Sequence, residues 1–485
     1  MSLVRVLNLP VVKKLIGVYL GKGSLFQCIH VCQSWFDAFH PILWQDIQVG
    51  VNQVSGVRVG PPNDVLVRNN QLIKSLKVHS FDAQVLDVTF TRLTELETSI
   101  IQHTIVLHYP WLAKLRIQGP CDYITEVAEK FAWDAVSQLI HLRHLALEAC
   151  YIGPHCVDEF WSACGRLESL EIFSVTLERT SNLINMTFPK LRKLYLKDVV
   201  GLTALDELYL ITRCPKLVDL KWISNDRGWF PETSLFAECV VAGVWPSLKK
   251  LDIHGVILDE QMTMICKGMQ KATKLVLAST VQTALLPTAC NQLKRHFNSL
   301  VQLDLRRAGA DSSTVCYILC SCPRLKVFAA DKVLARHIAD QLSWDCAMSL
   351  RVLALRLVFQ KDEYTLQRLV FQKLSILHRL EELSDDNHEA LDLDQARIGL
   401  DFRLMSGMGA LATLKQMRVL RFGSTQRLDT DDAKWMLLHW KQLETICGEP
   451  SADCNANGTI KEILAEGGVR CTAPRTLANG EDMDL

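Results

Sequence analysis

The chain has 485 residues, and its 49 % hydrophobic and 22 % charged residues are typical of a folded protein and exclude wholesale disorder. Its 53 basic residues equal its 53 acidic ones, a balance that disfavours nucleic acid as the main partner. The longest uncharged stretch, residues 275–293, contains Pro287 and three amide side chains, so we expect no membrane span and no membrane partner.

The first fifty residues have the pattern of a small helical bundle. Pro10 suits the first turn of a helix, Ile16 and Leu20 fall on one face of it, and the glycines that follow end it. A second helix is expected across residues 25–35. A unit this small buries little apolar surface, so we expect part of that surface to dock on a partner.

Four short motifs in this unit resemble an F-box: Leu-Pro, Ile-x-x-x-Leu, Val-Cys-x-x-Trp and Leu-Trp-x-x-Ile. F-box proteins hold the small adaptor of an SCF-type (cullin-RING) ubiquitin ligase, and their remaining domain recruits the substrate. The resemblance implies an F-box over residues 1–48. It also implies a set of adaptor-binding residues: Leu9, Pro10, Ile16, Leu20, Leu25, Val31, Cys32, Trp35, Leu43 and Trp44.

The chain departs from the F-box pattern directly after Pro10. The family usually has an acidic residue there, whereas this chain has two valines followed by Lys13 and Lys14. An alternative interpretation is a capping bundle that seals the first repeat of the array described next, since repeat arrays need specialised ends.

Leucine accounts for 73 of the 485 residues, which calls for a search for repeats. The pattern Leu-x-x-Leu-x-[Ile/Leu] occurs eight times, against about two occurrences expected by chance. All but the match at Leu205 form a ladder with steps of roughly 25 residues or about twice that. Looser copies fill the gaps and extend the ladder towards both ends: Ile73, Leu217, Ala272, Leu325, Leu380, Met417 and Leu443.

These spacings predict a leucine-rich-repeat solenoid of class α/β, with a curved parallel sheet inside and helices outside. Proline closes several of the intervening segments two residues before the first leucine, and residues 122–137 and 311–320 have helical spacing. A helical solenoid is the alternative, but it would need two or three helices in each unit of about 40 residues. We expect a linker at 49–70, repeats over 71–448, and a tail at 449–485 with one possible short helix. An F-box followed by such repeats resembles the fungal F-box/leucine-rich-repeat family.

In each repeat strand the leucines should point into the stack, so the third and fifth positions should face the concave side. These positions are charged and mixed early in the array and apolar around residues 327–354. We hypothesise that the apolar part anchors a target protein while Tyr195 and nearby charges set its register, unless the tail or a tighter curvature covers the apolar part. The expected target-binding residues are Lys193, Tyr195, Asp219, Lys221, Lys250, Asp252, Asp304, Val327 and Val352.

The residues predict no cofactor, metal site or catalytic centre. The 17 cysteines lack framework spacing, and basic residues interrupt the apolar N-terminus, so we expect reduced core thiols in the cytoplasm, the nucleus or both. Cys28 and Cys32 are expected on one helix face, without the second ligand pair of a zinc site. No Gly-x-Ser-x-Gly or His-Glu-x-x-His motif is present in the sequence.

Together these features predict a non-enzymatic substrate receptor. Its F-box would bind the adaptor and, through it, a cullin, while its repeats would bind an unidentified target for ubiquitin-dependent degradation. A repeat-based scaffold or inhibitor outside any ligase is the alternative, and an enzyme with a site assembled across repeats is a third hypothesis.

Overall fold

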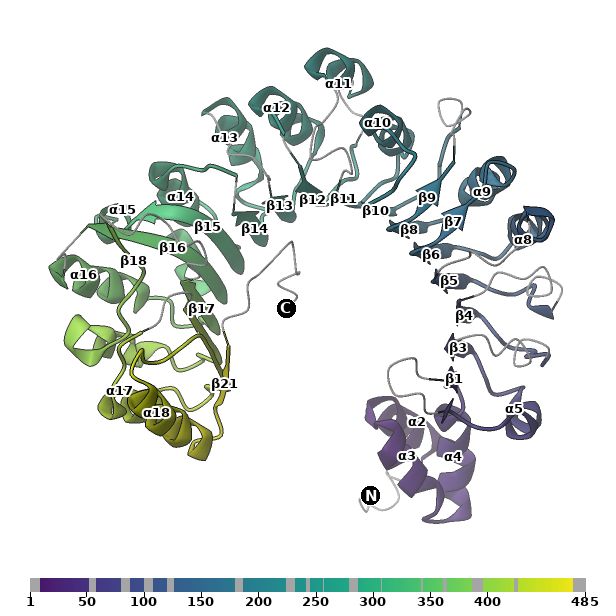
Figure 1. Cartoon of the computed structure of the whole chain (residues 1–485), viewed down its shortest axis with the longest axis horizontal. Helices are drawn as coiled ribbons and strands as arrows, with labels where there is room; N and C mark the ends of the chain where they lie inside the picture. The colour runs from purple at the N-terminus through teal and green to yellow at the C-terminus, as the bar shows by residue number, and fades with distance from the viewer. Residues whose placement is uncertain are drawn as a thin grey trace. The chain divides into compact units, whose positions relative to one another are not determined.

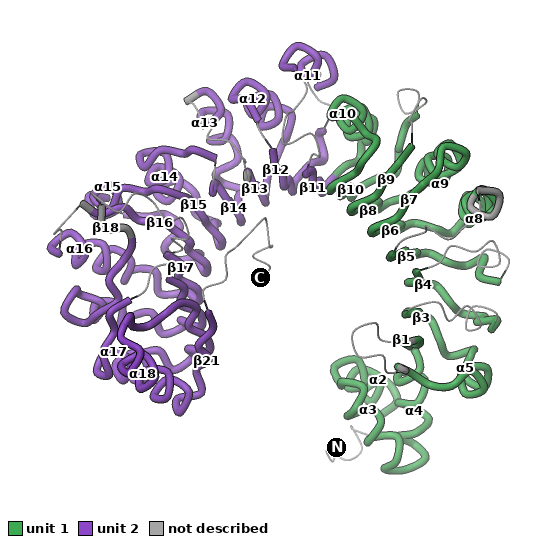
Figure 2. The backbone as a smooth tube through the Cα atoms, in the orientation of Figure 1, with its two compact units in different colours: residues 1–217 green, residues 218–485 purple. Residues whose placement is uncertain are grey.

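The computed structural model describes residues 9–51, 58–79, 88–99, 108–119, 126–178, 186–223, 232–240, 245–255, 257–278, 287–306, 308–341, 343–360, 364–385, 396–422 and 426–473. The chain divides into two compact units, residues 1–217 and 218–485 (Figure 2). Each unit is described separately below.

Unit 1 begins with a three-helix bundle formed by α2 (Pro10–Tyr19), α3 (Lys22–Ile29) and α4 (Gln33–Leu43). Pro10 occupies the first turn of α2, as expected. Gly17 lets α2 lie close to α4, because a Cβ at this position would be only 2.5 Å from Ile42 Cδ1. Phe39 is 1 % exposed and forms the centre of the bundle.

The structure corrects the expected helix over residues 25–35. Helix α3 ends at Ile29, and Cys32 is extended, with a φ of −166° and a ψ of 166°, where the chain enters α4. The chain therefore turns between Cys28 and Cys32, which do not share one helix face. Trp35 consequently belongs to α4, together with Leu43.

The rest of unit 1 is a parallel array of short strands (Figure 1). Each strand pairs with the next in the order β1 (Asp46–Val51), β3 (Ser75–His79), β4 (Glu95–Thr98), β5 (Lys114–Gln118), β6 (His144–Glu148), β8 (Ser169–Phe173) and β10 (Lys193–Lys197). Strand β2 (Arg58–Val59) is antiparallel to β1, and β7 (Tyr151–Ile152) pairs with β9 (Thr176–Leu177). The connecting helices are α5 (Asn63–Asn69), α8 (Glu126–Gln138), α9 (Val157–Cys164) and α10 (Ala204–Thr212).

The segment expected as a linker, residues 49–70, contains folded elements of this array. It holds the end of β1, the short strand β2 and helix α5, and β1 pairs in parallel with β3. The repeats therefore begin at Asp46, inside the range assigned to the F-box. The Gly-, Asn- and Pro-containing composition of this segment wrongly predicted a linker. Pro62 is the N-cap of α5 and does not interrupt the fold.

Unit 2 continues the same architecture. Its parallel strands are β11 (Asp219–Ile223), β12 (Lys250–His254), β13 (Lys274–Ala278), β14 (Gln302–Leu305), β15 (Val327–Leu334), β16 (Val352–Gln360), β17 (Glu382–Asp385), β19 (Val419–Phe422), β20 (Thr445–Cys447) and β21 (Arg470–Thr472). Strand β18 (Ala396–Ile398) is antiparallel to β16. The helices are α11 (Thr233–Cys239), α12 (Asp259–Gly268), α13 (Pro287–Leu293), α14 (Ser312–Leu319), α15 (Ala335–Ala339), α16 (Tyr364–Leu374), α17 (Thr430–His439) and α18 (Cys454–Glu466). Short 3-10 helices are η2 (Lys294–His296), η3 (Asp345–Met348), η4 (Leu404–Ser406) and η5 (Met408–Thr413).

Leucine stacking explains why these segments form one strand per repeat. The register aligns Leu76, Leu96, Leu115, Leu145, Leu170 and Leu194 across unit 1. In unit 2 it aligns Leu220, Leu251, Leu275, Leu303, Phe328, Leu353, Leu383, Leu420 and Ile446. All these side chains are at most 2 % exposed. Since no single repeat could bury its own strand and helix, stacking supplies the core, and the fold is an α/β leucine-rich-repeat solenoid.

The ladder read from the sequence is confirmed strand by strand, including every looser copy. The match at Leu205, which did not fit the ladder, lies in α10, where Thr203 and Asp206 form a capping box. Beyond residue 448, helix α18 is longer than the expected short helix, and β21 pairs with β20, so the array extends to Thr472.

Several strands of unit 1 are followed by a residue with a positive φ. The residue directly after β5, β6, β8 and β10 has a positive φ: Gly119 (114°), Ala149 (53°), Ser174 (51°) and Asp198 (52°). The amide of Ala149 donates to the carbonyl of Phe173, and that of Ser174 donates to Lys197. The left-handed residue thus turns the chain out of the sheet while keeping a bond to the next repeat, and only one of the four positions is glycine.

Candidate protein-binding surfaces

The N-terminal bundle exposes many large apolar side chains. Among the ten adaptor-binding residues expected from sequence, Leu9 is 49 % and Val31 62 % exposed, and Pro10 and Cys32 are also exposed. Ile16, Leu20, Trp35, Leu43 and Trp44 are half-buried, while Leu25 is 4 % exposed and belongs to the bundle core. The sequence motif therefore mixes surface residues with residues that hold the bundle together.

The most exposed apolar side chains of α2 were not among the expected ones. Val11, Leu15, Val18 and Tyr19 are 70 %, 58 %, 70 % and 88 % exposed. Their spacing of three, four and seven residues marks one broad helix face. That spacing is visible in the sequence, but the helix carries apolar residues on nearly all sides, so its pattern alone does not show which side packs inward.

The inward side of α2 is formed by small and polar residues. Gly17 packs against α4, and Lys13 is 2 % exposed, with its Nζ donating to Ser34 Oγ at 2.5 Å. The tryptophans of the motif have intramolecular contacts: Trp35 meets Phe39 edge-on at a ring distance of 5.4 Å. Substituting these tryptophans would therefore disturb the bundle as well as any interface.

On the sheet face away from the helices, the expected target-binding residues of unit 1 lie as the alternation predicted. Lys193 and Tyr195 of β10 are half-exposed, while Leu194 and Leu196 between and beside them are fully buried. Lys193 Nζ lies 2.6 Å from Glu171 Oε1 on β8 and 4.2 Å from the centre of the Tyr195 ring. The ring of Tyr195 is 6.4 Å from that of Phe173, which adds a second aromatic side chain to this surface.

The charged residues of this face in unit 2 are paired with one another. Lys221 lies 3.6 Å from Asp252, and Lys250 lies 3.8 Å from Asp219 on the neighbouring strand. Asp252 is 6 % exposed and also contacts His254 Nε2 at 2.8 Å. Lys221 and Asp252, whose side chains are 14 % and 8 % exposed, stabilise the strand register and are largely unavailable to a partner, whereas the side chain of Lys250 stays 54 % exposed.

The structure corrects the expected apolar contact surface near residues 327–354. Val327 and Val352 are 3 % and 2 % exposed, so neither offers a surface to a target. Asp304, 5 % exposed, accepts bonds from the guanidinium of Arg306, the shortest at 2.6 Å. Strand alternation gives the direction of a side chain but not what surrounds it, and here the small side chains of two adjacent strands are enclosed.

A metal site and a reactive thiol each set requirements for the cysteines of the described residues. Among the described residues, no cluster of three or more His, Cys, Asp or Glu side chains could hold a metal ion. Burial raises the pKa of Cys316 to about 11 and that of Cys322 to about 12, so these thiols stay protonated at neutral pH. Cys28 is half-buried and Cys32 exposed, which corrects the interpretation of this pair as core residues.

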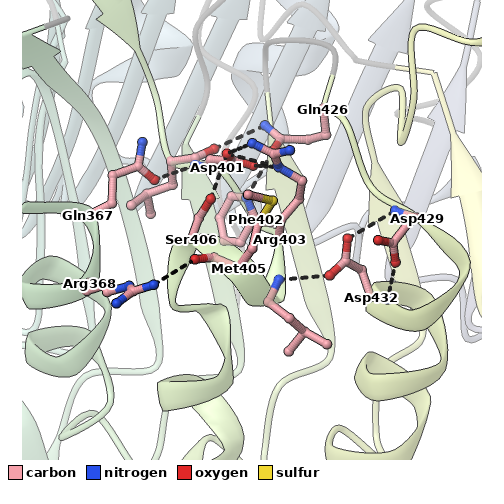
Figure 3. Close-up of polar contacts among 12 residues, drawn as sticks. Gln367, Arg368, Asp401, Phe402, Arg403, Met405, Ser406, Gln426, Asp429 and Asp432 are labelled. Carbon is pink, nitrogen blue, oxygen red and sulfur yellow. Dashed lines mark hydrogen bonds and ion pairs between the residues drawn. The ribbon is translucent and has the colours of Figure 1, made fainter. Parts of the chain in front are cut away.

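A buried polar cluster occupies the insertion between β17 and β19 (Figure 3). The carboxylate of Asp401, which is 3 % exposed, accepts two bonds from Arg403 Nε and one each from Arg403 Nη2, at 2.6 Å, and Ser406 Oγ, at 2.7 Å. This pairing raises the pKa of Arg403.

Side chains from the neighbouring repeats also accept hydrogen bonds from the backbone amides of residues 401–404. The amide of Asp401 donates to Gln367 Oε1, that of Phe402 to Gln426 Oε1, and that of Leu404 to Asp432 Oδ1. Burial raises the pKa of Asp432. The cluster satisfies buried groups that have no strand partner, which is a structural task.

No protein-family model and no curated protein match the sequence significantly. Solved structures do match. A chain in the crystal structure of the Rad7 and Elc1 complex in yeast has 12 % identity and a TM-score of 0.38, with 92 % of this chain and 90 % of that chain covered. An internalin (inlF) from Listeria monocytogenes has 14 % identity and a TM-score of 0.31, with 88 % and 91 % covered.

The ectodomain of the Arabidopsis receptor kinase HAESA has 12 % identity and a TM-score of 0.36, with 85 % of this chain and 71 % of that chain covered. Values this low carry no conclusion about function. Within the described ranges, no helix is long and apolar enough to cross a membrane.

Proposed function

We propose that this protein is the substrate-recognition subunit of an SCF-type ubiquitin ligase. The N-terminal bundle would bind the ligase adaptor and, through it, a cullin, while the repeats would bind the target protein. The chain itself would have no catalytic role, and it would act in the cytoplasm, the nucleus or both, leading to ubiquitin-dependent degradation of the target.

The exposed apolar surface of the bundle is the observation that carries this proposal. Val11, Leu15 and Val18 on α2, Phe26 on α3 and Val31 after it are each between 57 % and 70 % exposed. Such a concentration on about 35 residues marks an interaction site rather than a solvated cap. Each of these partly exposed apolar side chains contributes less than the about 1.5 to 3 kcal/mol of full burial when a partner covers it. Several of them must therefore be covered together to offset the cost of association.

The target surface is proposed on the sheet face around Tyr195. Its aromatic ring and that of Phe173 are half-exposed on adjacent strands, and aromatic side chains commonly dominate interface energetics. Lys193 is a poor probe of this surface, because reversing its charge would also leave Glu171 without its partner. Tyr195→Ala is the cleaner test of target binding.

The adaptor interaction is tested by co-purification of the full chain with the purified adaptor. The test variant carries Val11→Ser, Leu15→Ser and Val18→Ser. The matched control carries Met348→Ser, Met405→Ser and Leu438→Ser, which are 63 %, 65 % and 63 % exposed in unit 2. We expect a complex with wild type and with the control, and its loss in the test variant while circular dichroism stays unchanged.

Either of two results would contradict this proposal: wild type that fails to bind the adaptor, or a test variant that binds as wild type does. The first would favour a repeat-based scaffold or inhibitor outside any ligase. A deletion of residues 1–48 is unsuitable as a test, because it removes part of β1, which pairs with β3 in the repeat sheet.

A further inference from the structure

A column of side chains runs along the edge of unit 1 where the strands begin. A two-residue turn precedes each of β4, β5, β6, β8 and β10. The second residues of these turns are Arg92, Trp111, His141, Arg166 and Lys190. Backbone bonds stack the strand starts that follow: Ala113 donates to Thr94, Arg143 to Ala113, Glu168 to Arg143 and Arg192 to Glu168. Neighbouring members of the column are therefore separated by about one strand spacing, roughly 4.8 Å.

The middle of this column is aromatic and exposed. The rings of Trp111 and His141 stack with centres 4.8 Å apart and planes inclined by 28°. Trp111 is 60 % exposed, and Ile140, the first residue of the next turn, is 65 % exposed. No other described tryptophan is among the exposed large apolar residues, whereas Trp133 and Trp161 of the same unit are 1 % exposed.

Packing within the chain does not explain this position. The leucine that follows, Leu112, fills the core and is fully buried, so the turn needs no apolar residue before it. An exposed tryptophan on one turn and an exposed isoleucine on the next are typical of the anchor of a protein interface.

Cations lie on both sides of the aromatic pair. Arg92 and Lys190 are exposed, and in the described part of the chain neither has an ion-pair partner. Arg166 has a structural role, because its guanidinium donates to the carbonyls of Val136 and Ser137 at the end of α8. The column therefore has unneutralised positive charge at its ends and an apolar centre.

We propose that this edge, defined by Arg92, Trp111, Ile140, His141 and Lys190, binds an extended acidic peptide segment of a partner protein. A large apolar side chain of the peptide would pack on Trp111 and Ile140, and carboxylates before and after it would meet Arg92 and Lys190. The strand spacing brings successive members of the column within reach of an extended chain, which advances about 3.3 Å per residue. Ile140, directly before the residue whose ring stacks on Trp111, adds an exposed aliphatic side chain, which favours a peptide over stacked bases. The surface is separate from both surfaces of the proposed function.

Selection from a randomised library of displayed peptides tests this proposal. The full chain serves as bait, and the Trp111→Ala variant serves for counter-selection. The matched control is Phe131→Ala, on helix α8 of the same unit and 59 % exposed. We expect enrichment of peptides in which one large apolar residue is flanked by Asp or Glu. Such a peptide should bind at least about tenfold more weakly to Trp111→Ala and equally well to Phe131→Ala.

Charge reversal provides the second measurement on a selected peptide. The double variant Arg92→Glu with Lys190→Glu should weaken binding about fivefold or more at low salt and flatten its salt dependence. The double variant Lys14→Glu with Lys267→Glu changes the net charge equally at two other exposed lysines, neither of which has an ion-pair partner in the described part of the chain, and it should leave binding unchanged. The proposal is overturned if no peptide distinguishes wild type from Trp111→Ala, or if the selected peptides lack acidic residues. Trp111-dependent binding of a dT oligonucleotide in place of peptides would also overturn it.

Discussion

Three left-handed residues that are not glycine store conformational energy at the ends of successive strands in unit 1. Ala149, Ser174 and Asp198 have φ values of 53°, 51° and 52°. For residues with a Cβ this conformation costs about 1 to 2 kcal/mol. All three side chains are exposed, so replacing them with glycine removes no buried packing. Ala149→Gly should therefore stabilise the fold.

The size of the effect is a difference of two terms. Glycine relieves about 1 to 2 kcal/mol of strain in the folded state, but it also gives the unfolded chain more freedom, worth about 0.4 to 1 kcal/mol. We expect a net gain of about 0.5 to 1 kcal/mol for Ala149→Gly and for Ser174→Gly. Asp198→Gly should gain less, because a short polar side chain tolerates the left-handed region better.

Denaturant unfolding of the single variants and of the triple variant measures this gain. The reverse change is available at the turn after β5: Gly119→Ala should cost at least about 1 to 2 kcal/mol, because a φ of 114° is strained for a residue with a Cβ even though that Cβ would meet only Ser99 Cβ, 3.8 Å away. Gly201→Ala is the steric contrast, because its Cβ would lie 1.7 Å from the carbonyl oxygen of Leu177, and it should cost much more. Destabilisation by Ala149→Gly and Ser174→Gly would refute the reasoning.

Three further predictions concern buried groups. His296 is fully buried, its Nδ1 accepts a bond from the amide of Ala272, and burial lowers its pKa from 6.5. Below pH 6.5 the unfolded chain therefore binds more protons than the folded chain, so the free energy of unfolding should decrease as the pH falls below that value. The decrease should be smaller in His296→Gln. Gly17→Ala should loosen the bundle by about 1 to 3 kcal/mol in thermal unfolding, while Gly21→Ala, where a Cβ meets nothing within 4 Å, should be nearly neutral. Asp401→Ala should lower the free energy of unfolding by about 3 to 5 kcal/mol in a denaturant titration, because it leaves the Arg403 guanidinium unpaired. Glu444→Ala breaks the half-exposed pair with Arg418 and should lower it by less than about 1 kcal/mol.

The repeat architecture could be predicted because the leucines of the pattern all serve one purpose, which is to fill the core between stacked repeats. A strand that packs on its neighbours must bury alternate residues, and that requirement leaves a local pattern at each strand. The same reasoning located β11 from Leu217 and β19 from Met417, although neither segment matches the strict pattern.

The insertion that carries β18 and the 3-10 helices η4 and η5 could not be predicted in this way. Its backbone bonds go to Gln367, Gln426 and Asp432, which come from three separate segments of the chain. A single polar residue in a sequence does not show which distant amide it will accept. Such contacts become visible only when the repeats are stacked.

The direction in which a strand side chain points and its exposure to a partner are separate properties of a repeat surface. Only the direction follows from the sequence. Lys221 and Val352 both lie at positions predicted to face the same side of the sheet, yet Lys221 is paired with Asp252 and Val352 is enclosed. Binding variants at such positions would change strand pairing or packing together with any interface. Leu15 of the bundle and Trp111 of the turn column are 58 % and 60 % exposed, and the ring contact of Trp111 is with His141, which is itself at the surface. Loss of binding in variants at these two positions, with the fold intact, therefore reports on an interface alone.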